Sequence, residues 1–198
     1  MTHVGPKPLP GQTIGLLGGS FDPPHAGHLH ISKVAMKRFN LAQIWWLVSP
    51  GNPLKEHGPA PLCDRIEACR KLVDDPRIKI TDYEAQVGTR YTAATLEALF
   101  RDYPSQRFVW LMGADNLTSF HKWGRWEWIL NTIPVGVIAR PTQRLAARFS
   151  PSARKYRDFR IRARQSRKLA HADAPAWCFV NAPMMDISST KLRETRDR

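Results

Sequence analysis

Residues 18–28 read GGSFDPPHAGH, and this stretch decides the fold class. The apolar run at 14–17 before it predicts a buried strand, and the segment 29–39 after it predicts a helix. Glycines between a strand and a helix let the backbone approach an anion closely. The free N–H groups at the start of a helix favour negative charge there. The sequence therefore predicts a phosphate-binding turn in an α/β protein.

Two histidines, His25 and His28, lie three residues apart in the first turn of the predicted helix and therefore on one face. Imidazoles beside a phosphate cradle indicate phosphoryl or nucleotidyl transfer. Zinc binding is an alternative, but it needs a third ligand, and the chain has neither an HExxH nor a CxxC motif. Incidental surface histidines are the other alternative. The run is neither a Walker loop nor a GxGxxG fingerprint.

The rest of the chain alternates strand and helix patterns. Strands are predicted at 12–18, 43–49, 77–81, 108–113, 133–139 and 177–180, and helices at 26–39, 61–74, 92–103, 126–131 and from Ser189 onward. This order predicts a Rossmann-like, doubly wound α/β fold, with a mostly parallel sheet of five to six strands and helices on both faces. We expect a flexible lead at 1–11 and a single domain at 12–198, which includes the basic segment 140–170.

The polar motifs of the chain each follow a predicted strand. GGSFDPPHAGH follows the first strand, PGNPLKEH (50–57) the second, GADNLTSFHKW (113–123) the fourth, and ARP (139–141) the fifth; ISSTKLR (187–193) opens the last helix. Because ligands of such folds bind beyond the carboxyl ends of the strands, near the switch in strand order, these motifs predict one shared site.

Composition limits the class of protein. The 198 residues are 42% hydrophobic, and no apolar run approaches the roughly 20 residues of a membrane helix. The N-terminal segment has no apolar signal core, so a cytoplasmic protein without a membrane partner is expected. Cys63, Cys69 and Cys178 form no CxxC pair and are expected to be free thiols.

The formal charge of +13 is concentrated in one segment. Residues 140–168 hold eleven basic side chains and one acidic side chain, Asp158. A solvated helix or loop, substrate steering and a contact between copies in a homo-oligomer are the alternatives for this segment. Nucleic acid is not the expected partner, because the segment offers for base stacking no aromatic side chains beyond Phe149, Tyr156 and Phe159.

GGSFDPPHAGH resembles the HxGH signature of the nucleotidyltransferase superfamily, in the form found in bacterial nicotinate-nucleotide adenylyltransferases. ISSTKLR resembles the second superfamily signature, Ser/Thr-x-x-Arg. Between them, RYTAATL (90–96), GADNL (113–117) and Trp123 resemble the landmarks of that family, in the same order. The resemblance extends from about residue 12 to residue 193, so it covers almost the whole chain.

The resemblance implies transfer of the adenylyl group of ATP to nicotinate mononucleotide, which gives deamido-NAD and pyrophosphate in NAD biosynthesis. The nucleophile is a phosphate monoester whose second pKa is about 6, so it needs no general base at neutral pH. The protein has to supply in-line positioning and charge stabilisation at the α-phosphate. Mg²⁺ is expected to accompany ATP, and no metal ligand is expected from the chain.

The family's functional residues map onto three groups in this chain. The implied catalytic residues are His25, His28, Lys55 and Arg193. The implied ATP-binding residues are Gly18, Gly19, Ser20, Phe21, Gly113, Asp115, Ser189 and Thr190. The implied residues for nicotinate mononucleotide are Tyr91, Thr92, Trp123 and Arg140. Backbone N–H groups of Tyr91 and Thr92 would receive the nicotinate carboxylate, Trp123 would stack on the pyridine ring, and Asp115 would accept from the ribose.

Several of these residues are also compatible with a purely structural role. Lys55 lies in GNPLKEH where the family usually has Pro-Pro-His-Lys, and a solvated loop lysine is its alternative. Asp115 is compatible with a helix cap, Trp123 with a core position, and ISSTKLR with an N-cap followed by a basic turn. The alternative functions are another HxGH enzyme (a nicotinamide-mononucleotide or pantetheine-phosphate adenylyltransferase, or a cytidylyltransferase) and a non-catalytic nucleotide- or RNA-binding protein.

Overall fold

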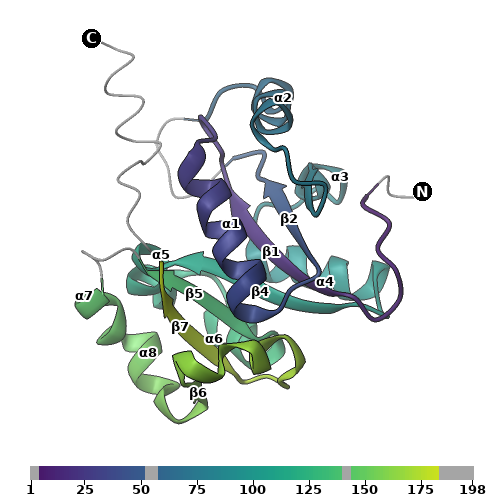
Figure 1. The fold of residues 1–198 in the computed structure, drawn as a ribbon. Coiled ribbons are helices and arrows are strands. Elements are labelled where there is room, and N and C mark those ends of the chain that lie inside the picture. Colours follow the sequence, from purple (N-terminus) through teal and green to yellow (C-terminus); the bar gives the residue numbers. More distant parts are fainter. Residues whose placement is uncertain (1–4, 52–57, 140–143, 183–198) are drawn as a thin grey trace.

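A computed structural model describes residues 5–51, 58–139 and 144–182 of the chain (Figure 1). Within these residues, seven strands form one sheet in the order β3-β2-β1-β4-β5-β7-β6, and every neighbouring pair is parallel. The strands are β1 (Thr13–Gly19), β2 (Gln43–Val48), β3 (Ile78–Thr81), β4 (Arg107–Gly113), β5 (Val135–Ala139), β6 (Arg160–Ile161) and β7 (Trp177–Asn181).

Helices connect successive strands. They are α1 (Ala26–Phe39), α2 (Leu62–Leu72), α3 (Tyr83–Gln86), α4 (Thr92–Asp102), α5 (Ala114–Ser119), α6 (Trp126–Thr132), α7 (Arg144–Arg148) and α8 (Pro151–Lys155), with 3₁₀ segments η1 (Phe120–Lys122), η3 (Arg157–Phe159) and η4 (Ala163–His171). None of the helices in the described ranges is long and apolar enough to cross a membrane.

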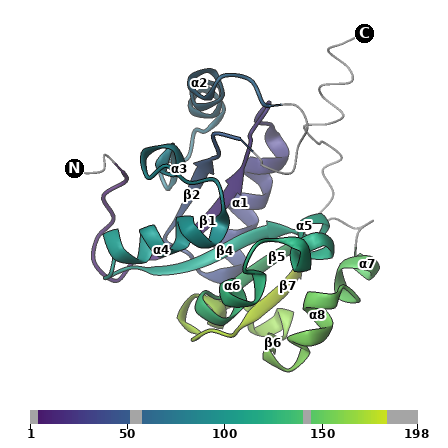
Figure 2. The ribbon, with the colours of Figure 1, turned by 180° about the vertical axis from the view of Figure 1, so that it is seen from behind.

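Each face of the sheet carries its own hydrophobic core. On one face, Phe39 of α1, Cys69 of α2 and Leu169 of η4 are fully buried. On the other face, Leu96 of α4 and Ile129 of α6 are fully buried as well. Figure 1 shows α1 in front of the sheet, and Figure 2 shows α4 and α6 in front of the opposite face. Both faces of a parallel sheet have to be covered in this way, which is why its strands are almost wholly apolar.

The strand order reverses between β1 and β4. From β1 the chain adds β2 and then β3 on one side, and it then returns through α4 to place β4 on the other side of β1. The backbone turns that follow β1 and β4 therefore lead to opposite faces of the sheet. This arrangement opens a crevice at the carboxyl ends of the two strands, where ligands of doubly wound folds bind.

The predicted doubly wound parallel sheet is confirmed, and the sheet has one strand more than the five to six expected. The additional strand is β6, which consists of two residues and pairs with β7 through Arg160 opposite Trp177. It lies inside the basic stretch, where no apolar run could have indicated it. The strand predicted at 133–139 begins two residues later, after Pro134. The predicted helix from Ser189 lies outside the described residues.

Candidate active site

The two histidines of the GGSFDPPHAGH stretch form the N-terminal cap of α1. His25 is the N-cap residue, and its Nδ1 accepts a hydrogen bond from the backbone N–H of Gly27 at 3.1 Å. The backbone N–H of His25 donates in turn to Nδ1 of His28 at 3.2 Å. This reciprocal pair is a capping box built from two imidazoles. The sequence spacing placed the two rings on one face, but it did not predict that they cap the helix.

The cap determines where each imidazole carries its proton. Because Nδ1 of both His25 and His28 accepts from the backbone, the proton of the neutral ring lies on Nε2. The ring centroids are 3.9 Å apart, and His25 is almost completely buried. The arrangement therefore presents two neighbouring Nε2–H donors in fixed orientations at the carboxyl end of β1.

A buried aromatic cluster fixes the orientation of the His28 ring. Phe21 stacks on Trp46 at 4.7 Å and contacts the His28 ring at 4.8 Å. The indole N–H of Trp46 donates to the Ser32 hydroxyl at 2.8 Å, and this hydroxyl donates to the carbonyl of His28 at 2.9 Å. Since the Phe21 side chain is buried, we assign it the support of His28 rather than a side-chain contact with ATP.

Glycine at position 18 allows close packing against Trp110. A side chain at Gly18 would bring its Cβ to 2.8 Å from the Trp110 ring, whereas one at Gly19 would make an ordinary contact of 3.4 Å with the Phe21 ring. Phe21 itself has a φ of +49°, in the left-handed region that costs energy for a bulky residue. Gly18, Gly19 and Ser20 are partly exposed, so they line the open side of this strained turn.

A buried arginine, Arg65 of α2, holds the turn in place. Its guanidinium donates to the carbonyls of Ser20 at 2.6 Å, Ser49 at 2.8 Å and Ala60 at 2.7 Å. These carbonyls belong to the β1–α1 turn, the end of β2 and the start of α2. Burial lowers the pKa of the guanidinium, and the charge of Asp22 opposes this effect. Arg65 thus ties three segments at the carboxyl edge of the sheet.

The sequence interpretation missed Arg65, although a signal for it exists. Leu62, Ile66 and Cys69 form the inward stripe of α2, and Arg65 lies within that stripe. A charged residue on the buried face of a helix needs partners, and carbonyls at loop ends are suitable ones.

The turn after β4 brings Gly113 and Asp115 to the same edge. Gly113 is the N-cap residue of α5, and no side chain caps this helix. The exposed Asp115 carboxylate lies over Gly113, where a Cβ would collide with it. Asp115 is therefore not a helix cap, and its carboxylate faces solvent beside β1.

The residues predicted to bind the pyridine nucleotide lie at the start of α4 and after η1. Tyr91 is the exposed N-cap residue of α4 and makes no side-chain cap, so the first N–H groups of the helix, from Thr92 onward, have no capping partner in the described residues. Trp123 is partly buried and meets the rings of Phe120 at 5.1 Å and Trp110 at 6.4 Å, edge to face. The loop that carries Trp123 is tied to α4 by an ion pair of 2.7 Å between Arg125 and Glu97.

Beneath the Tyr91 turn lies a buried carboxyl group that the sequence interpretation also missed. Glu84 of α3 accepts from the Thr95 hydroxyl at 3.1 Å and hydrogen-bonds the Ser49 side chain. Its backbone carbonyl accepts from the N–H of Thr89 at 2.9 Å. Burial raises the pKa of Glu84, although both side-chain hydrogen bonds oppose the increase. Its Oε2 atom has no partner among the described residues.

This raised pKa predicts a pH-dependent effect of Glu84→Gln on stability. The folded protein holds this proton more tightly than the unfolded chain, so the stability that the carboxyl group contributes is full in acid and is lost as the pH rises through the raised pKa. We expect the melting temperature of the Gln variant to exceed that of the parent at pH 8 and to approach it toward pH 4.

The measurement is thermal unfolding by circular dichroism across this pH range. Glu67→Gln, at an exposed position on α2, is the matched control and should shift the melting temperature little. If the difference in melting temperature between Glu84→Gln and the parent grows toward acid pH, the raised pKa of Glu84 is contradicted.

The structure brings most of the described candidates to one edge. His25, His28 and the glycine turn follow β1, Asp115 follows the adjacent β4, and α4 begins at the same end of the sheet. The remaining candidates, Lys55, Arg140, Ser189, Thr190 and Arg193, lie outside the described residues. Gly51, which ends the described part of the β2 loop, and Ala139, which precedes Arg140, both lie at the carboxyl edge.

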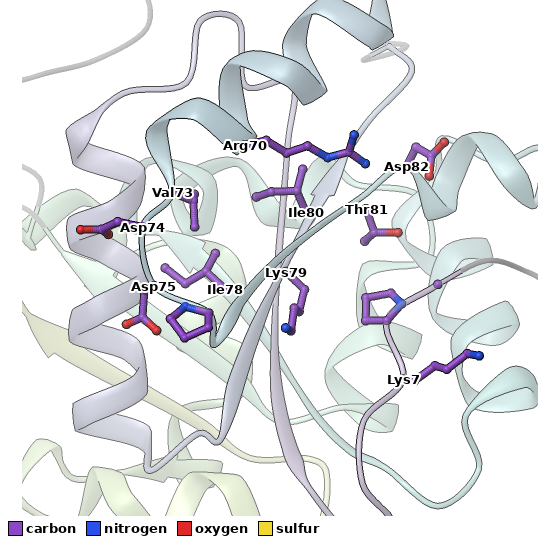
Figure 3. A pocket seen from close by; sticks show the side chains of 13 residues that line it. Lys7, Arg70, Val73, Asp74, Asp75, Ile78, Lys79, Ile80, Thr81 and Asp82 are labelled. Carbon is purple, nitrogen blue, oxygen red and sulfur yellow. The ribbon is translucent and has the colours of Figure 1, made fainter.

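Two cavities of about 550 Å³ include none of the candidates. One is beside the edge strand β3, where Lys79, Thr81 and Asp82 line it together with the C-terminal end of α2 and residues 5–7 (Figure 3). The other is lined mainly by basic side chains near α8. Cavity size alone would therefore have pointed away from the imidazole pair.

Known proteins resemble this chain over nearly its whole length. The cytidylyltransferase-like family model matches residues 16–195. A protein of Ruegeria pomeroyi named as a probable nicotinate-nucleotide adenylyltransferase is 58% identical over 188 residues, which are 95% of this chain and 88% of that protein. A protein of Methylorubrum extorquens with the same name is 49% identical over 181 residues, 91% of this chain and 98% of that protein.

Solved structures show the same fold. The nicotinic acid mononucleotide adenylyltransferase of Plasmodium falciparum, in complex with NaAD, superimposes with a TM-score of 0.72 at 17% sequence identity. The alignment covers 92% of this chain and 83% of that one. The same enzyme in complex with APC gives a TM-score of 0.69. At this identity the likeness establishes the architecture.

Proposed function

Because the chain belongs to the nicotinate-nucleotide adenylyltransferases of the cytidylyltransferase-like family, we propose that the imidazole pair at its switch point promotes adenylyl transfer from ATP to nicotinate mononucleotide. The products are deamido-NAD and pyrophosphate. The observation that carries the mechanism is the reciprocal His25–His28 cap, which fixes two Nε2–H donors beside a glycine turn.

The reaction is an in-line displacement at phosphorus. A phosphate oxygen of the mononucleotide attacks the α-phosphorus of ATP, the bond from this phosphorus to the bridging oxygen breaks, and pyrophosphate leaves with the electron pair. The attacking phosphate is already ionised at neutral pH, so no proton has to be removed from it. His25 and His28 donate from Nε2 to the oxygens on which negative charge grows, and donors fixed before the reaction cost no reorganisation.

The remaining ATP contacts extend this arrangement. Gly18, Gly19 and Ser20 bind phosphate oxygens from the open side of the turn, and the Asp115 carboxylate accepts from a ribose hydroxyl. The placement of both segments at adjacent strand ends supports these roles. Four further residues complete the phosphate site in this proposal: Lys55, Ser189, Thr190 and Arg193.

The start of α4 binds the nicotinate carboxylate. Its uncapped N–H groups at Thr92 and beyond, together with the positive end of the helix dipole, favour an anion over a neutral amide. Trp123, whose loop is tied to α4 by the ion pair of Arg125 and Glu97, stacks on the pyridine ring, and Arg140, directly after β5, adds positive charge. This arrangement predicts that nicotinate mononucleotide is preferred to nicotinamide mononucleotide, because the amide group carries no negative charge.

Magnesium is the divalent ion that we propose accompanies ATP. In residues 5–51, 58–139 and 144–182 no group of three His, Cys, Asp or Glu side chains is arranged to hold a metal ion. In many nucleotide sites Mg²⁺ takes most of its ligands from phosphate oxygens and water, so it does not need a cluster of protein carboxylates. Bound to the triphosphate, the ion would neutralise charge on the leaving pyrophosphate.

Pyrophosphate release with a panel of acceptors tests the proposed function. ATP and Mg²⁺ are supplied in parallel with nicotinate mononucleotide, nicotinamide mononucleotide or phosphopantetheine. We expect rapid release with nicotinate mononucleotide, at least tenfold slower release with the amide, and none with phosphopantetheine. Release with phosphopantetheine alone would overturn the substrate assignment. Release with none of them would overturn the enzymatic assignment.

Trp123→Ala provides a more local test of substrate binding. Loss of the stacking surface should raise the Michaelis constant for nicotinate mononucleotide about tenfold, since an aromatic stack contributes roughly 1 kcal/mol or more. The Michaelis constant for ATP should stay within a factor of two of the parent value.

Trp128→Ala is the matched control, because its indole lies on α6 against Arg125. Melting temperatures of both variants show whether the fold is intact. If Trp123→Ala and Trp128→Ala have equal Michaelis constants for the mononucleotide, Trp123 has only a packing role in the core and does not contact the substrate.

A further inference from the structure

The second cavity, of about 550 Å³, is lined mainly by basic side chains. It lies between α8, β6 and the first residue of β7, and five of its eight lining residues are basic while none is acidic. The basic residues are Arg148, Arg154, Lys155, Arg157 and Arg160. The cavity beside β3 is different, because three aspartates accompany the three basic side chains that line it (Figure 3).

Three of these five basic side chains have no ion-pair partner among the described residues. Lys155 pairs with Glu127 at 2.6 Å, and Arg157 lies 3.5 Å from Asp158. The other three arginines of the cavity have no carboxylate within 4 Å in the part of the chain that the structure describes. Concentrated charge of one sign with no internal partner favours a bound counter-ion.

Arg160 is held rigidly in this cavity. As part of β6 it pairs with Trp177, and its guanidinium lies over the rings of Trp177 at 5.3 Å and Phe179 at 5.8 Å. Burial lowers the pKa of Arg160, and the nearby charge of Arg148 lowers it further. The Arg160 side chain is therefore held in position before a ligand binds, and the charged group that it faces is a second cation, Arg148. An incoming anion would relieve this repulsion.

The shape of the charged groups and one exposed ring indicate the class of anion. Guanidinium groups match the oxygens of phosphate in two-pronged hydrogen bonds. Phe149 follows Arg148 at the cavity and is 71% exposed. An exposed phenyl ring beside phosphate-binding side chains is suited to stacking on a flat base.

We propose that this cavity is a second nucleotide site, in which Arg148, Arg154 and Arg160 bind a polyphosphate group and Phe149 stacks on the base. The site is separate from the imidazole pair. Trp177 begins β7, so the cavity lies toward the amino end of that strand, whereas the pair follows the carboxyl end of β1. Figure 1 shows α8 and β6 at one end of the molecule and the start of α1 at the other.

Calorimetric titration of the full chain with ATP at physiological salt tests this site. We expect two ATP molecules per chain for the parent protein. In the double variant Arg148→Gln/Arg154→Gln the second site should weaken at least tenfold, while the turnover number with saturating substrates stays unchanged. Arg164→Gln/Arg167→Gln removes the same charge from exposed positions of η4 that do not line the cavity, and it should keep both sites.

Two further comparisons identify the bound chemistry. Inorganic tripolyphosphate should fill the second site more weakly than ATP, and Phe149→Ser should remove this difference. Arg160→Lys keeps the charge but not the planar fork, so it should weaken the site at an unchanged melting temperature. One ATP site in the parent protein, or equal weakening in the η4 control, would overturn the proposal. So would a short single-stranded RNA that binds the cavity while ATP does not.

Discussion

His28→Ala should lower the turnover number for adenylyl transfer by about 10²–10³-fold, because one fixed donor to a developing oxyanion contributes that much in enzymes that use such donors. The Michaelis constant for ATP should change far less, since the donated hydrogen bond strengthens as charge grows at the α-phosphate. Initial rates of pyrophosphate release at saturating ATP and nicotinate mononucleotide measure the effect. The expected loss is the largest among the variants of the described residues.

The alanine variant also removes half of the α1 cap, so a second variant has to separate the two roles. Glutamine is a common residue at the third position of a capping box and can accept from the N–H of His25. His28→Gln should therefore recover the melting temperature while its turnover number stays low. His30→Ala removes an imidazole from another face of the same helix and should leave turnover within a few-fold. Near-normal turnover of both His28 variants would remove this ring from the mechanism.

Arg65→Gln should lower the free energy of unfolding by about 3 kcal/mol or more. The change leaves the carbonyls of Ser20, Ser49 and Ala60, in partly buried hydrogen bonds, without their charged donor, and a single hydrogen bond to a charged group is worth about 1.5–3 kcal/mol. Urea unfolding followed by circular dichroism measures the loss. Because Ser20 belongs to the turn before α1, kcat/KM should also fall at temperatures where the variant is folded.

Arg70→Gln is the control for this experiment. Arg70 lies on the exposed face of the same helix, so its replacement should change the free energy of unfolding by less than about 0.5 kcal/mol. Arg65→Lys keeps the charge but has no planar guanidinium group. Its free energy of unfolding should lie between those of the parent and the Gln variant. Equal stabilities of the Arg65 and Arg70 variants would show that the three carbonyls do not depend on this side chain.

The sequence was most informative where one physical requirement acts on consecutive residues. A fully buried parallel strand has to be apolar throughout, so 14–17 and 43–49 were recognisable, and the glycine turn after β1 marked the carboxyl edge. The order of motifs then predicted the shared site, because each motif follows a strand. The general behaviour of βαβ units predicted a mostly parallel sheet, but the order of its strands was not predicted from the sequence.

Features that depend on partners distant in sequence could not be predicted in this way. The three carbonyls that bind Arg65 come from three different loops, and the hydroxyl partners of Glu84 come from the residue after β2 and from α4. The strand β6 exists because β7 offers it an edge, and its own two residues carry no strand pattern. In the imidazole pair, spacing predicted a common face, whereas the reciprocal cap needed the backbone geometry of His25.

The stereochemical course of the reaction at phosphorus tests the central claim most directly. The capped histidines act as donors through Nε2–H, so the adenylyl group passes straight from pyrophosphate to the mononucleotide in one in-line step. With one diastereomer of ATP that carries sulfur on the α-phosphorus, the deamido-NAD formed should have inverted configuration at that phosphorus. Retention would contradict the account, because it requires two displacements and a covalent adenylyl group on the protein.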